Sequence, residues 1–277
     1  MKSRKWLVAV VCGAMVAALA LAGCSSNNAS SSSASASASA SSSASDGYSL
    51  VKAGTLTVGT SPDYPPFENL ENGEYVGFDM DLTRAVADKL GLQFEPTTIQ
   101  FDGIIPAVIA GGKVDVGVSG FSVDPERAKQ IDFTDSYYVD DQAVVTMKTS
   151  ALTADNVDAD LNKSGMTIAV QSGTTGEDYA KENYPNANVV AYGNATDSFA
   201  AMQAGKADAV CTNDAVAQKM VKSSYTDAHI IKEDATGEEY AMVVSKNNPQ
   251  LTEAINKALK ELKDDGTIDQ LVQKYFG

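Results

Sequence analysis

Residues 114–133 read V-D-V-G-V-S-G-F-S-V-D-P-E-R-A-K-Q-I-D-F and contain a strand, a loop and a helix start in direct succession. The apolar residues of 114–118 predict a strand, and the small polar residues of 119–122 predict the loop that follows it. Asp124 suits a helix N-cap, and Pro125 suits the first helical position. We therefore expect free backbone N–H groups and hydroxyls to gather at the carboxyl end of this strand.

Arg127 falls in the first turn of that helix, close in sequence to Ser119 and Ser122. A guanidinium matches a carboxylate with two parallel charge-assisted hydrogen bonds. The chain after residue 23 contains 16 Lys but only two Arg, Arg84 and Arg127, so lysine supplies the ordinary surface charge. The stretch predicts a carboxylate-binding site, and an exposed salt bridge of Arg127 is the open alternative.

A second copy of this unit lies further along the chain. Residues 107–115 (A-V-I-A-G-G-K-V-D) are echoed by residues 201–208 (A-M-Q-A-G-K-A-D), and in both a helix ends in Gly before Lys-x-Asp opens an apolar strand. Open α/β sheets bind ligands at the carboxyl ends of their strands. The repeat therefore indicates two α/β lobes that face each other through such loops and form a clamp.

The rest of the chain alternates strands with helices, which favours βαβ units and mostly parallel sheets flanked by helices. The local signals predict a tight turn at Asn72-Gly73, a helix over 80–90 capped by Asp79, a short helix over 104–110 with Pro106 in its first turn, and a helix over 249–264.

The N-terminal residues 1–23 have the pattern of a secretory signal peptide, with Lys2, Arg4 and Lys5 before an apolar run. A transmembrane anchor is the alternative, although the run is short for one. Leu21-Ala22-Gly23-Cys24 resembles the lipobox of bacterial lipoproteins, which implies lipidation of Cys24. Residues 25–45 contain only Ser, Ala and Asn, so we expect 24–47 to be a tether between the lipid and the folded body.

Charge and cysteine content exclude several classes of function. Without the signal, 18 basic residues stand against 36 acidic ones, a net charge of −18, which disfavours nucleic acid and anionic lipid as partners. Cys211 is the one cysteine left for the folded body, and it lies in an apolar run where a buried thiol is expected. With one histidine, His229, we expect no metal site and no cofactor.

Several further motifs follow one another along the chain. Besides the Arg127 stretch they are 59–67 (G-T-S-P-D-Y-P-P-F), 76–82 (V-G-F-D-M-D-L), 101–106 (F-D-G-I-I-P), 170–176 (V-Q-S-G-T-T-G), 265–267 (D-G-T) and 275–276 (Y-F). In this order they resemble the polar amino-acid branch of the extracellular solute-binding proteins that serve ABC importers. The resemblance runs from about Leu56 to Phe276. It implies a two-lobe periplasmic-binding-protein-like fold joined by two crossover strands.

The resemblance also implies domain boundaries. Lobe 1 is expected to comprise 48–139 plus 241–277, and lobe 2 to comprise 140–240. Asp140 and Asp141 lie near the expected crossover, and we expect both to be solvated.

By the same resemblance, each lobe contributes to a ligand site. Tyr64 and Phe101 are expected to flank the ligand side chain, and the first lobe to hold the α-carboxylate of the ligand with Arg127. The full expected set is Ser61, Tyr64, Phe101, Ser119, Gly120, Ser122, Arg127, Gln171, Thr174, Thr175, Asn213 and Asp214. Tyr64 and Phe101 as core aromatics, and Thr174 and Thr175 as simple helix caps, are the alternatives.

Two positions depart from the family pattern. Members that bind basic amino acids usually have Asp where this chain has Ser61, so we expect a polar, uncharged ligand. Most members have Asp at Asn213 to hold the α-ammonium; here either the Asn213 amide oxygen or the neighbouring Asp214 would have to do so.

These observations favour a non-enzymatic, monomeric protein, anchored to the outer face of the bacterial cell membrane by its lipid alone. It would bind a free amino acid and deliver it to an ABC permease. A sensory lipoprotein without transport and a dehydratase of prephenate-like acids are the alternatives. The dehydratase needs a general acid at the cleft, and glutamate is a common choice. The only glutamates in the expected cleft loops are Glu126 and Glu177, and both fall in first helical turns.

Overall fold

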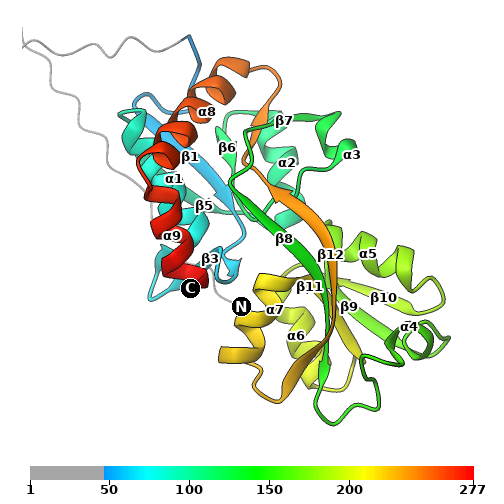
Figure 1. The fold of residues 1–277 in the computed structure, drawn as a ribbon. Helices are drawn as coiled ribbons and strands as arrows, with labels where there is room; N and C mark the ends of the chain where they lie inside the picture. Colours follow the sequence, from blue (N-terminus) through cyan, green and yellow to red (C-terminus); the bar gives the residue numbers. More distant parts are fainter. Residues whose placement is uncertain (1–46) are drawn as a thin grey trace, which may run out of the picture. The chain divides into compact units, whose positions relative to one another are not determined.

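The computed structural model describes residues 47–277 (Figure 1), and the first of its two five-stranded sheets has the order β5-β1-β6-β13-β7. Its strands are β5 (Gln93–Thr98), β1 (Thr55–Thr60), β6 (Val116–Gly117), β13 (Val243–Ser245) and β7 (Ile131–Phe133). β1 is parallel to β5 and β6, whereas β13 is antiparallel to β6 and β7. The late strand β13 therefore returns the chain to the sheet that it began.

The second five-stranded sheet has the order β10-β9-β11-β8-β12. Its strands are β10 (Asn188–Tyr192), β9 (Thr167–Gln171), β11 (Ala209–Asn213), β8 (Tyr138–Met147) and β12 (Ala228–Tyr240). β9 is parallel to both β10 and β11, and β8 is antiparallel to β11 and β12. The long strands β8 and β12 run side by side and carry the chain from one sheet to the other (Figure 1), so they are the two crossovers of a two-lobe α/β fold.

Helices flank both sheets. They are α1 (Phe78–Lys89), α2 (Phe101–Ala110), α3 (Pro125–Ala128), α4 (Val157–Asp160), α5 (Thr175–Asn183), α6 (Ala195–Gln203), α7 (Asp214–Ser223), α8 (Pro249–Asp264) and α9 (Thr267–Phe276). α1, α8 and α9 pack together beside the first sheet, and α5, α6 and α7 pack on the second. The predicted helix over 249–264 is confirmed as α8, whose buried face includes Leu251, Ile255 and Leu259.

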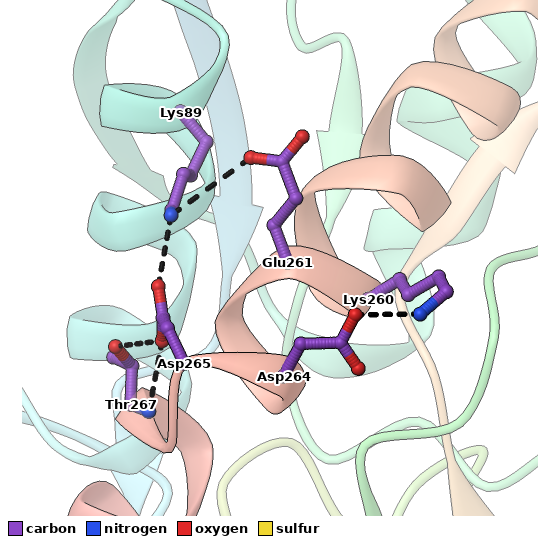
Figure 2. A network of polar contacts seen from close by, with 6 residues as sticks. All are labelled: Lys89, Lys260, Glu261, Asp264, Asp265 and Thr267. Carbon is purple, nitrogen blue, oxygen red and sulfur yellow. Dashed lines mark hydrogen bonds and ion pairs between the residues drawn. The ribbon is translucent and has the colours of Figure 1, made fainter.

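The turn between α8 and α9 explains the D-G-T motif (Figure 2). Asp265 accepts hydrogen bonds from the backbone N (3.0 Å) and Oγ1 (2.6 Å) of Thr267, and it also accepts one from Lys89 of α1 at 2.9 Å. The hydrogen bond from Lys89 is the main reason why the pKa of Asp265 is lowered to about 2. The motif therefore closes the turn between α8 and α9 and joins it to α1.

A small antiparallel sheet of β2 (Asp63–Tyr64), β3 (Glu68–Glu71) and β4 (Glu74–Val76) follows β1. The predicted Asn72-Gly73 turn joins β3 to β4, and both of its residues have positive φ, as the tightest hairpin turns require. Phe67, at the base of this hairpin, is fully buried, and its ring contacts those of Phe78, Tyr138, Tyr240 and Phe276.

The repeat read from the sequence has matching contacts in the two sheets. The carboxylate of Asp115 accepts a hydrogen bond from the backbone N of Thr57 in β1 at 2.9 Å, and the backbone N of Asp115 donates to the carbonyl of Thr57. Asp208 makes the same pair of bonds to Thr167 in β9, the carboxylate accepting at 2.7 Å. Each Lys-x-Asp therefore fastens its strand entry to the neighbouring parallel strand of its own sheet.

Three predictions of local structure were wrong. Asp79 lies inside α1 and is fully buried, because it accepts hydrogen bonds from Gly120 N and the Tyr137 hydroxyl. Pro106 lies in mid-helix, since α2 begins at Phe101 and not at Ile104. Asp140 is buried rather than solvated, because it accepts hydrogen bonds from Tyr240 Oη and Ala215 N, and burial raises its pKa to about 6.

Residues 1–46, which include the expected signal, Cys24 and most of the expected tether, lie outside the described residues. Within 47–277, no helix is long and apolar enough to cross a membrane. Cys211 is buried, as predicted, and burial raises its pKa. The lobe boundaries at 139/140 and 240/241 stay a prediction.

Candidate functional site

A cavity lies where the loops of the two sheets meet, and nine of the twelve expected site residues line it. They are Tyr64, Phe101, Gly120, Ser122, Arg127, Gln171, Thr174, Thr175 and Asn213. The cavity has a volume of about 10 Å³, which is enough for one water molecule and no more. The structure is therefore a closed form, and any larger ligand requires the two sides to separate or the lining side chains to move.

Arg127 is positioned by the helix start that the sequence predicted. The Asp124 side chain accepts hydrogen bonds from the backbone N of Glu126 and of Arg127, both at 2.9 Å, and Pro125 opens α3. The Arg127 guanidinium lies over the stacked rings of Phe101 and Phe121, 5.6 and 5.7 Å from their centroids. Helix capping and ring stacking together fix its direction.

The hydrogen-bond partners of Arg127 are carbonyl oxygens from both sides of the cavity. Nη1 donates to Ser122 O and Nη2 to Gly173 O, each at 2.9 Å. Within residues 47–277 it forms no ion pair, so the surface salt bridge considered as an alternative is absent there. Burial lowers the pKa of this guanidinium. A partly desolvated guanidinium whose hydrogen bonds go only to neutral carbonyl oxygens favours an incoming anion.

Asn213 and Tyr64 connect the two sides of the cavity. The Tyr64 hydroxyl donates to Asn213 Oδ1 at 2.8 Å and lies 3.1 Å from Thr212 Oγ1. Asp214 is the first residue of α7, where its carboxylate accepts a hydrogen bond from Gln218 one turn later, and it does not line the cavity. The structure thus brings Asn213, but not Asp214, to the site.

The two threonines at the start of α5 have different partners. Thr174 is the N-cap: its hydroxyl accepts from Glu177 N at 3.2 Å and donates to Gln171 O at 2.8 Å. The Thr175 hydroxyl instead donates to Glu238, at 2.7 Å. Gln171 also lines the cavity, and its Nε2 is buried without a partner.

Ser61 and Ser119 lie behind the cavity and hold its loop. Ser61 N donates to Ser119 Oγ at 3.1 Å, and Ser119 Oγ donates to the fully buried carboxyl of Glu68 at 2.8 Å. Burial and the nearby Asp79 raise the pKa of Glu68 well above its ordinary value, and burial raises the pKa of Asp79 to about 6. This acid pair therefore positions residues 119–120 without reaching the cavity.

Sequence reasoning missed Glu238 and Gln142, which stand on the two crossover strands. One oxygen of Glu238 accepts hydrogen bonds from Ser122, Thr175 and Asn213, and the other accepts from Gln142 Nε2 at 2.7 Å. A carboxylate thus contacts three residues of the cavity lining from behind, whereas the sequence predicted no glutamate beyond Glu126 and Glu177 near the cleft. Gly237, directly before it, was the available signal, because Gly inside a strand pattern indicates a bulge.

A wider hollow of about 870 Å³ is lined by residues of β4, α1, β5 and α9, including Asp81, Arg84 and Lys274. Asp81 pairs with Arg84 at 3.0 Å and with Lys274 at 2.7 Å, so both cations already have an anionic partner. Within the described residues no cluster of His, Cys, Asp and Glu could hold a metal ion. The small cavity, in contrast to this hollow, has the convergent polar groups that a binding site needs.

Two α/β sheets, two crossover strands and an enclosed polar cavity between their loops define a protein that closes around a small ligand. Comparison with known proteins gives the family. Residues 56–277 match the model of the bacterial extracellular solute-binding proteins, family 3, and the chain belongs to that family, whose members act outside the cytoplasm.

Individual relatives agree. The chain is 32% identical to the arginine-binding extracellular protein ArtP of Bacillus subtilis (strain 168), over 99% of this chain and 98% of ArtP. The solved structure of an ancestral arginine-binding protein bound to glutamine has a TM-score of 0.75 at 40% identity, over 82% of this chain and 99% of that one. The ancestral amino acid-binding protein AncCDT-1, described as a precursor of cyclohexadienyl dehydratase, has a TM-score of 0.72 at 38% identity, over 81% and 96%.

Proposed function

We propose that this protein binds one free α-amino acid in the cavity and delivers it to an ABC-type permease. The observation that carries the proposal is the half-buried Arg127 guanidinium, which has only carbonyl partners and lines the same cavity as Ser122 and Thr175. These groups suit a carboxylate. The relatives include proteins named as arginine-binding and amino acid-binding, which supports the view that this carboxylate belongs to an amino acid.

For the ligand side chain we propose a polar, uncharged group. Ser61 is neutral and turns its hydroxyl to Asp63, and Asp63 in turn accepts a hydrogen bond from Ala195 N at the start of α6. The nine lining residues include no carboxylate, and the Gln171 amide lacks a partner for its nitrogen. Arginine is the competing ligand, because it is in the name of the ArtP relative.

Anchoring belongs to the proposal as well. Cleavage before Cys24 and lipidation of its sulfur would hold the protein at the outer face of the cell membrane, with 25–45 as the tether. Labelling of the cells with a radioactive fatty acid, with Cys24→Ala as the control, tests this part.

The site supports amino-acid binding better than catalysis of the dehydratase type, although AncCDT-1 is similar in structure. A general acid must donate a proton, whereas both oxygens of Glu238 act here as acceptors. Turnover of a prephenate-like acid by the purified protein would contradict this assignment.

A thermal-shift screen of the purified chain against the common amino acids, followed by calorimetry of each hit, tests the function. We expect stabilisation by a small set that includes glutamine or another uncharged polar amino acid. Tight binding of arginine alone would overturn the side-chain proposal, and no binding of any amino acid would overturn the function. Uptake of the best ligand by cells with and without the gene tests delivery.

A further inference from the structure

We propose that Glu238 holds the ligand's α-ammonium, the role that family resemblance would give to the position of Asn213. The inference rests on the proposed function, since it concerns an α-amino acid in the same cavity. Asn213 itself cannot supply a negative charge, and its amide oxygen already accepts the Tyr64 hydroxyl at 2.8 Å. Asp214 is turned away toward Gln218. Among the described residues that contact the cavity lining, Glu238 offers a carboxylate at the place where the ammonium needs one.

The backbone aims this side chain at the cavity. The pairing of β12 with β8 shifts register between Asp234 and Glu238, so residues 235–237 form a bulge. Gly237 takes a φ of 63°, and its N–H is held by Asp141 Oδ1 at 2.9 Å. Bulges commonly redirect a side chain next to a functional site. The neighbouring Glu239 is exposed, so the bulge determines which of two adjacent glutamates reaches the site.

The present partners of Glu238 show how a ligand would fit. Oε2 accepts hydrogen bonds from the hydroxyls of Ser122 and Thr175, the same hydroxyls that would serve the ligand carboxylate. A ligand carboxylate at those hydroxyls removes two donors from Glu238. Its ammonium, on the adjacent carbon, replaces them with a charged donor.

Two further donors would keep Glu238 in place during this exchange. Gln142 Nε2 donates to Oε1 at 2.7 Å, and Asn213 Nδ2 donates to Oε2 at 3.2 Å. Gln142 is buried in β8, so its amide is a fixed support. The zwitterion would then lie between Arg127 on one side and Glu238 on the other, each charge opposite its counter-charge.

Calorimetry on the full chain in mild detergent tests this role with two pairs of probes: L-glutamine and glutaramic acid, which lacks only the ammonium, and L-arginine and its des-amino analogue. Wild type should prefer the bound amino acid over its analogue by about tenfold or more, as a charge-assisted hydrogen bond predicts. In Glu238→Gln the amino acid should weaken while the analogue hardly changes, so the preference largely disappears. Glu238→Asp keeps the charge on a shorter stem and should retain part of it; this second variant also serves if the first does not fold.

Glu239→Gln, one residue along the same strand, is the matched control and should keep the wild-type preference. An undiminished preference in Glu238→Gln would overturn the inference while leaving the proposed function intact. So would tighter binding of both amino acid and analogue, since Glu238 would then be a competitor of the ligand carboxylate. If wild type binds no amino acid, the inference and the proposed function fail together.

Discussion

The Tyr64 hydroxyl donates a hydrogen bond of 2.8 Å to Asn213 Oδ1 across the cavity, and the backbone N of Asn213 donates back to that hydroxyl at 3.4 Å. Tyr64 belongs to the hairpin sheet after β1, and Asn213 ends β11 of the second sheet. Burial raises the pKa of Tyr64, so the phenol stays protonated and can donate. The pair therefore stabilises the closed form directly.

We expect Tyr64→Phe to weaken amino-acid binding by about twofold to tenfold, because a neutral hydrogen bond contributes about 0.5–1.5 kcal/mol. Closure contributes to affinity only if contacts made in the closed state alone support it. Calorimetry with the ligand found in the screen measures the change. Tyr75→Phe is the matched control, since its hydroxyl bonds to Thr98 Oγ1 at 2.7 Å on the exposed surface. Equal losses in the two variants would contradict a special role for Tyr64.

Arg127→Ala should weaken binding by about tenfold to a hundredfold or more, since a charge-assisted hydrogen bond contributes about 1.5–3 kcal/mol and the ligand carboxylate would stay desolvated. Arg127→Lys should recover only part of the affinity, because a point charge cannot reach Ser122 O and Gly173 O as the fork does.

Arg84→Ala is the control for both Arg127 variants. Arg84 is exposed, pairs with Asp81 at 3.0 Å and lies over the Phe94 ring, and it does not line the cavity. Its removal should leave affinity unchanged. A well-folded Arg127→Ala protein, judged by circular dichroism, that binds as tightly as wild type would remove Arg127 from the site.

The parts of the fold that sequence reasoning predicted are those set by local signals. Asp124 caps α3 through atoms two and three residues away, and α8 follows from its apolar spacing. The Lys-x-Asp repeat pointed to the two equivalent strand entries. The family motifs then carried nine of the twelve expected residues to one cavity.

The parts that were missed depend on partners distant in sequence. Residues 233–239 (E-D-A-T-G-E-E) have little strand propensity, yet they extend β12 because β8 pairs with them. Glu238 reaches the residues that line the cavity next to a bulge in that pairing. Asp79 looked like an N-cap, and only Gly120 and Tyr137, 41 and 58 residues away, make it a buried acceptor.

The repeated aspartates allow a graded test of stability. Asp115 is buried and accepts from Val51 N and Thr57 N, whereas Asp208 accepts from Thr167 N in a partly buried site. We expect Asp115→Ala to lower the free energy of unfolding by about 2–3 kcal/mol and Asp208→Ala by about 1 kcal/mol, because unpaired buried N–H groups keep their desolvation cost. Urea unfolding measures both losses. A larger loss in Asp208→Ala would contradict the expectation that the more buried of the two equivalent aspartates contributes more stability.

The buried pair of Glu68 and Asp79 predicts a stability that falls as pH rises. Both folded-state pKa values are raised, that of Asp79 to about 6 and that of Glu68 well above its ordinary value. Stability from this pair is therefore fully present below the unfolded pKa values of about 4 and is lost as pH rises through the folded ones. While the native state holds one extra proton, the free energy of unfolding falls by about 1.4 kcal/mol per pH unit.

Glu68→Gln keeps the shape of the side chain but has no proton to lose. We expect its free energy of unfolding, measured in urea from about pH 5 to about pH 8, to fall less steeply than that of wild type by up to one proton's slope. The buried Asp140, whose pKa is also raised to about 6, contributes equally to both proteins and so cancels from the difference. Glu74→Gln, on the exposed hairpin, should follow the wild-type slope. Equal slopes for wild type and Glu68→Gln would show that the buried pair does not share a proton in the folded protein.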